Sequence, residues 1–144
     1  MELIYGRAAG AECRQREGTA TGAVWGTSVL PTTDGVTINT VYFAPGARTY
    51  WHRHGGGQLL RVANGHGWVG LRGQAAEPMR EGDLVWAAPG EEHWHGAKGD
   101  AFLVHLAVSL GNTEWLEEVA AADVSAATGR HGDRGLTGHE GMQR

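Results

Sequence analysis

The chain has one cysteine, Cys13, and that scarcity excludes several kinds of site. A single thiol cannot form an intramolecular disulfide or build a zinc or iron–sulfur centre that needs several cysteines. No apolar run reaches the roughly 18 residues of a membrane-spanning helix, and no basic-then-apolar leader opens the chain. We therefore expect a cytoplasmic protein with no membrane partner.

Positive charge and proline are also scarce. Twelve Lys and Arg against 16 Asp and Glu give a net charge of 12 − 16 = −4 with His neutral, so we expect no nucleic-acid partner. With only 4 prolines, the 24 glycines do not make a collagen or linker composition and instead indicate many tight turns. The length, 144 residues, is that of one domain.

From residue 23 onward, short β-rich segments are separated by Gly, Pro and Asp. Asn64-Gly65 is typical of a two-residue hairpin turn. The expected strands cover residues 24–30, 36–43, 48–54, 58–62, 66–72, 73–79, 83–88, 94–97 and 102–108. Strands this short and this closely spaced predict an all-β sandwich or barrel.

Three segments make up the predicted domain organisation. Residues 1–22 form an N-terminal segment with an edge strand at residues 3–5, and residues 23–122 form the barrel with a short helix. The helix is predicted over residues 113–122, because apolar side chains fall at 115, 116 and 119. Residues 123–144 lack any periodicity and are expected to be a flexible tail.

Histidine is abundant, with 8 in the chain, and two pairs stand out. His52 and His54 share one face of an expected strand, so their rings can act as a two-point clamp for a divalent metal. The glycines at 55–57 bend the backbone and let Gln58 return toward the same point. His93 follows the Pro89-Gly90 turn and begins a second pair with His95.

Two segments around these histidines resemble the two motifs of the cupin family. The first has the form Gly46-(five residues)-His52-x-His54-(three)-Gln58-(six)-Gly65, with Gln where Glu is usual. The second has the form Gly82-(seven residues)-Gly90-x-x-His93, with Ala88 where the pattern has Pro. Only 16 residues separate the two, as in small single-domain bacterial cupins. The resemblance covers about residues 41–110 and implies a double-stranded β-helix, or jelly-roll barrel.

Residues 44–58 and 82–97 look most like the manganese-dependent cupin hydroxynitrile lyases, which convert cyanohydrins to an aldehyde and hydrogen cyanide or run the reverse reaction. That resemblance implies a metal held by His52, His54, Gln58 and His93. It also places His95 and His105 in the active site, with Asn39, Val41 and Ser109 facing a small-molecule substrate.

The residues themselves support parts of this interpretation. A neutral amide at Gln58 leaves the charge of a divalent ion uncancelled, which makes the ion a stronger Lewis acid. His105 shares a strand face with Ala107 and Ser109, which suits a pocket wall, and a near-neutral imidazole can carry a proton.

Several alternatives remain open at the level of sequence. The ligand types suit Mn, Fe, Ni or Zn, with Mn favoured by the resemblance. The protein could instead be an Fe(II)-dependent dioxygenase of a small aromatic or enol substrate, a non-catalytic module that binds a metal or small molecule, or a decayed cupin without metal. Unpaired edge strands at residues 3–5 or 24–30 predict a homodimer or homotetramer.

Overall fold

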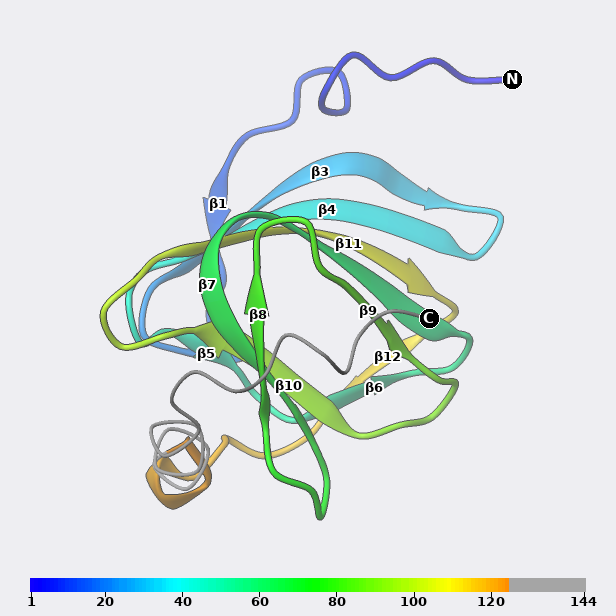
Figure 1. Ribbon diagram of the computed structural model, residues 1–144. Helices are drawn as coiled ribbons and strands as arrows, with labels where there is room; N and C mark the ends of the chain where they lie inside the picture. The colour runs from blue at the N-terminus through cyan, green and yellow to red at the C-terminus, as the bar shows by residue number, and fades with distance from the viewer. Residues whose placement is uncertain (125–144) are drawn as a thin grey trace.

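The computed structural model describes residues 1–124, and in that part of the chain a single twelve-stranded sheet curls into a barrel (Figure 1). A short helix follows at residues 121–124. In chain order the strands are β1 Arg14–Gln15, β2 Ala20–Thr21, β3 Val24–Thr33, β4 Val36–Phe43, β5 Arg48–Thr49, β6 His52–His54, β7 Gly57–Leu71, β8 Glu77–Arg80, β9 Leu84–Ala87, β10 His93–Ala97, β11 Leu103–Leu110 and β12 Thr113–Trp115. The all-β prediction is confirmed. No helix in the described part is long and apolar enough to cross a membrane.

The strands form two walls that share β7. One wall runs β1-β3-β4-β11-β7 with β9 beside β7, and the other contains β10, β5, β2, β6, β8 and β12. The first half of β7 pairs with β11 and β9, and its second half pairs with β10 and β8. The barrel therefore closes through one long strand that passes from one wall to the other.

The hairpin predicted at Asn64-Gly65 is wrong, because β7 continues through both residues. Gly65 has a φ of +89°, and a Cβ there would collide with the carbonyl oxygen of Phe102. The ladder between β7 and β11 also shifts register at Val104/His105. Such a bulge bends a strand and increases its twist. The glycine thus bends one strand instead of connecting two.

The core reflects the alternation along the strands. Val62 and Leu103 are at most 1% exposed and pack with Phe43 and Val24 between the walls. A second cluster buries Trp51, Trp68, Trp94, Ala76 and Val119 outside the second wall. Each fully buried large aliphatic or aromatic side chain contributes about 1.5–3 kcal/mol. The clusters make the walls rigid supports for the side chains between them.

Both ends of the described chain differ from prediction. Residues 3–5 form no strand, and Leu3 and Tyr5 are exposed; the edge of β3 pairs with β1 instead. The helix predicted over residues 113–122 is wrong for most of its length. Residues 113–115 form β12 and pair with β6, residues 116–120 are neither helix nor strand, and the helix covers 121–124. A strand is favoured at residues 113–115 because the pairing sets Trp115 opposite His52, and tertiary contact outweighs a weak helix propensity. The tail predicted for 123–144 lies, from residue 125 on, outside the described residues.

Candidate metal centre

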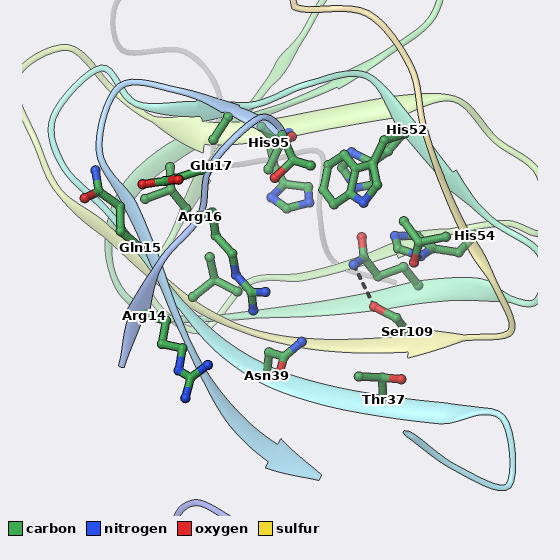
Figure 2. A pocket seen from close by; sticks show the side chains of 18 residues that line it. Arg14, Gln15, Arg16, Glu17, Thr37, Asn39, His52, His54, His95 and Ser109 are labelled. Carbon is green, nitrogen blue, oxygen red and sulfur yellow. Dashed lines mark hydrogen bonds between the residues drawn. The ribbon is translucent and has the colours of Figure 1, made fainter. Parts of the chain in front are cut away.

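A cavity of about 520 Å³ opens between the two walls of the barrel. Its inner end, formed by buried residues, carries imidazoles from β6 and β10, and exposed residues of the N-terminal segment line another side (Figure 2). The lining residues are Arg14, Gln15, Arg16, Glu17, Thr19, Ala20, Val24, Thr37, Asn39, Val41, Thr49, His52, His54, Gln58, His95, Ser109, Thr113 and Trp115. The volume is typical of a site for a small organic ligand.

Histidine side chains crowd the inner end of this cavity. The ligand atoms of His52, His93 and His95 lie within 4.8 Å of one another, and all three residues are buried. The His54 ring lies 5.1 Å from that of His52 and 5.5 Å from that of His93, between centroids. The pairing of β10 with β6 brings His93 opposite His52, although 40 residues separate them in the chain.

Backbone carbonyls orient two of these rings. Nδ1 of His52 lies 2.8 Å from the carbonyl oxygen of Tyr50, and Nδ1 of His93 lies 2.8 Å from that of Glu91. A carbonyl oxygen only accepts, so each Nδ1 carries the proton and each Nε2 of a neutral ring has a free lone pair. A second hydrogen bond of this kind is what commonly fixes a metal-binding imidazole.

His54 completes the set from the same strand as His52. Its Nδ1 lies 2.9 Å from the hydroxyl of Thr113 on β12. Its Nε2 is buried and has no hydrogen-bond partner among residues 1–124. A buried nitrogen without a partner is costly unless something absent from the chain satisfies it.

Gln58 supplies an oxygen to the same point. Its amide nitrogen donates to the hydroxyl of Ser109 at 3.0 Å, the dashed line in Figure 2. This orientation places Oε1 2.9 Å from Nε2 of His93. Two ligand atoms that are each about 2.1 Å from one metal ion, with an angle of about 90° between them at the ion, lie about 3.0 Å from each other. The amide oxygen and the imidazole lone pair therefore have the separation of neighbouring ligands on one cation.

Burial keeps these rings neutral, the form in which they bind metal. Desolvation, with the His93 ring close by, lowers the pKa of His52 to about 3. Desolvation also lowers the pKa of His54 to about 4 and lowers the pKa of His93 below its ordinary value. Because a metal ion competes with protons for the same lone pairs, low pKa values favour binding at neutral pH. The donor set fits a divalent cation.

A second histidine pair lies beside this centre. Nδ1 of His95 is 2.9 Å from Nε2 of His105, and both residues are buried against Phe43. The backbone N–H of His95 donates to the hydroxyl of Thr49 at 3.2 Å. Nε2 of His95 and Nδ1 of His105 find no partner in residues 1–124. Desolvation lowers the pKa of His105 to about 4 and that of His95 well below its ordinary value.

The structure brings the residues singled out from the sequence into one place. His52, His54, Gln58 and His93 surround one point, and Asn39, Val41 and Ser109 line the cavity beside it. His95, expected from the sequence beyond the ligand position, lies within ligand distance of the others: its ring nitrogen belongs to the three-histidine group with His52 and His93.

Sequence reasoning missed several residues of the cavity lining, among them Arg16, Thr49, Thr113 and Trp115. The Trp115 ring lies 4.6 Å from that of His52, between centroids. Thr113 and Trp115 alternate around Glu114, which is the strand signal that could have revealed them. Thr49 and Arg16 carry no such signal.

Comparison with known proteins identifies the family. The Cupin domain model matches residues 39–109. A cupin-like protein from Thermotoga maritima superimposes with a TM-score of 0.76 at 34% identity, over 89% of this chain and 99% of that one. A polyketide cyclase from Streptomyces resistomycificus, at 18% identity, shares the fold with a TM-score of 0.66 over 83% of this chain and 86% of the cyclase. The chain belongs to the cupin family.

A curated enzyme matches part of the chain. An (R)-mandelonitrile lyase from Granulicella tundricola is 45% identical over 84 residues, which make up 56% of this chain and 64% of the lyase. The match thus spans less than two thirds of the length of that enzyme.

Proposed function

We propose that this protein is a metal-dependent cupin lyase that cleaves small hydroxynitriles, R–CH(OH)–CN, to an aldehyde and hydrogen cyanide, or joins them in reverse. The observation that carries the proposal is the cluster of buried imidazoles with an amide oxygen on the wall of a cavity of about 520 Å³. The 45% identity to a mandelonitrile lyase across 84 residues supports the same reaction.

In this proposal His52, His54, Gln58 and His93 hold one divalent ion, with manganese favoured. When bound, the ion supplies Lewis acidity that stabilises negative charge on the substrate oxygen. Three imidazoles and an amide are all neutral ligands, so none of them reduces that acidity. His95, the third member of the compact histidine group, is left free to handle protons.

His95 acts as base and then as acid, and His105 assists it. Nδ1 of His95 is engaged with His105, so its Nε2 is free to accept the proton of the substrate hydroxyl. The C–C bond to the nitrile then breaks, its electron pair leaves with cyanide, and the hydroxyl carbon becomes the aldehyde. The proton on His95 passes to cyanide and regenerates the neutral ring. His105 orients His95 and shares the positive charge through the 2.9 Å contact.

Pocket residues orient the substrate during this step. Asn39, Val41 and Ser109 line the cavity next to the histidines, and Ser109 also fixes the amide of Gln58. The Trp115 ring, tilted by 37° to that of His52, gives the cavity an apolar surface for the R group.

Two measurements on one preparation test the proposal. Protein purified without chelator is analysed for metal, and benzaldehyde release from mandelonitrile is followed by absorbance. We expect about one equivalent of manganese together with cleavage, and the loss of both in His52→Ala. His66→Ala is the matched control, because His66 is exposed and lies outside the cavity.

Other results would overturn the proposal. Bound iron with oxygen consumption and no benzaldehyde release would assign the protein to the dioxygenases. Full metal occupancy with no turnover of any substrate would indicate a binding module, and no metal above the His52→Ala background would indicate a decayed site.

A further inference from the structure

One guanidinium points into the cavity from outside the barrel walls. Arg16 follows β1 in the N-terminal segment and lines the same cavity as His52 and His95. Figure 2 shows its side chain pointing inward from that segment, on the side of the cavity where Asn39 lies. The segment that carries it is outside residues 39–109, the part matched by the family model.

The charge of Arg16 is not neutralised by the described chain. Its guanidinium makes no hydrogen bond or ion pair with any residue in 1–124. By contrast, Arg14 lies 3.7 Å from Glu12, and Arg72 pairs with both Glu92 and Glu117. An arginine that faces a cavity with all its donors free is equipped to receive an acceptor from a ligand.

Gly26 positions this side chain. A Cβ at Gly26 would collide with the Nη2, Nε and Cζ atoms of Arg16, so the guanidinium rests directly on the backbone of β3. Gly26 does not adopt a positive φ, and the absence of a side chain is therefore the property that matters. Arg16 is exposed overall, and this packing is the contact that sets its guanidinium against β3.

Charge around the cavity favours an anion. Arg14, Arg16 and Glu17 are the charged residues on the lining, and Glu17 forms no ion pair with Arg16. The lining therefore carries one more cationic than anionic side chain, and because Arg14 is paired with Glu12 outside the lining, Arg16 is the cation left to meet a ligand. A planar carboxylate can accept two parallel hydrogen bonds from the paired donors of a guanidinium.

We propose that Arg16 selects substrates that carry a carboxylate on the end remote from the reacting carbon, so that the natural substrate is an acid-bearing hydroxynitrile or aldehyde. This inference rests on the proposed function for the identity of the reacting end. A cavity of about 520 Å³ has room for such a group beyond the metal centre. Arg16 is thus a specificity-determining residue, and Gly26 is a positioning residue for it.

Binding without turnover tests the inference directly. Calorimetric titration of the purified protein compares 4-(hydroxymethyl)benzoate with the neutral 4-methylbenzyl alcohol. We expect the carboxylate to bind at least tenfold more tightly, with a preference that weakens as salt rises. Arg16→Met and Gly26→Ala should each abolish the preference, since one removes the charge and the other displaces it. Arg14→Met, which removes a neighbouring charge already paired with Glu12, should keep it.

Turnover provides a second readout. The cyanohydrin of 4-formylbenzoate should exceed mandelonitrile in kcat/KM by a similar factor, and Arg16→Met should remove that advantage through KM. Equal affinity of the wild-type protein for the two alcohols, or a preference that survives both Arg16→Met and Gly26→Ala, would overturn the inference. If no hydroxynitrile is cleaved but the preference disappears in both variants, the proposed function fails and the carboxylate site stands.

Discussion

Mild acid should destabilise the metal-free protein, because its native state buries neutral imidazoles. His52 and His105 are 1% and 0% exposed, and burial lowers their pKa values to about 3 and about 4 from 6.5. Above pH 6.5 neither the native nor the unfolded state binds protons at these rings. Between pH 6.5 and the native pKa values only the unfolded chain does, so the free energy of unfolding falls as pH falls.

The size of the effect follows from the pKa shifts. At pH 5, a ring whose pKa drops from 6.5 to about 4 or lower contributes about 2 kcal/mol in favour of the unfolded state. The two rings together contribute about 4 kcal/mol, a large share of the roughly 5–15 kcal/mol that holds a typical domain folded. The lowered pKa values of His54, His93 and His95 act in the same direction.

Urea unfolding of chelator-treated protein, followed by tryptophan fluorescence at pH 7.5 and pH 5, measures this loss. The difference between the two pH values should be about 4 kcal/mol or more in the wild type and smaller by about 2 kcal/mol in His105→Gln. His66→Gln, which changes an exposed ring, should leave the difference unchanged. A wild-type difference below about 1 kcal/mol, or an equal difference in His105→Gln, would refute the reasoning.

Four further predictions concern the site, the fold and assembly. Gln58→Glu adds a carboxylate, so it should hold metal more tightly against chelator and lower kcat at least tenfold. His95→Gln should retain metal while kcat falls by about a hundredfold. Gly65→Ala should cost more than about 2 kcal/mol in urea unfolding, because its φ of +89° and the Phe102 carbonyl both oppose a Cβ. Leu59 and Trp86 are paired neighbours, 36% and 56% exposed, and we propose that they lie in a homodimer or homotetramer interface; Trp86→Lys should yield monomers by light scattering.

Each of these has a distinguishing control. Metal lost in His95→Gln would make His95 a ligand, and unchanged chelator resistance in Gln58→Glu would remove Gln58 from the ligand set. Gly35 also has a positive φ, +79°, but a Cβ there would meet nothing within 4 Å, so Gly35→Ala measures the cost of backbone strain alone. If Gly65→Ala lowers the free energy of unfolding no more than Gly35→Ala does, the Phe102 contact is excluded as a cause. A wild-type monomer would refute the interface.

The local features of the site were readable from the sequence. His52 and His54 share a face because alternate residues of any strand do, and the glycines that follow allow Gln58 to return. His105 stood out as a polar ring in an apolar segment, and the structure buries it completely. Short strands between glycine turns likewise predicted an all-β barrel. All of these depend on spacing along a few consecutive residues.

The tertiary structure decided what depends on pairing between distant segments. Asn64-Gly65 could form a hairpin turn or only bend β7. The outcome depends on the Phe102 carbonyl, which packs against Gly65 although it lies 37 residues further along the chain. Residues 113–115 are a strand because β6 offers them an unpaired edge, and that pairing carries Thr113 to His54. Arg16 enters the cavity because Gly26 leaves space on the backbone of β3. Spacing along the chain determines on which face of a strand a side chain lies. Contacts between remote segments determine which residues pack against that face.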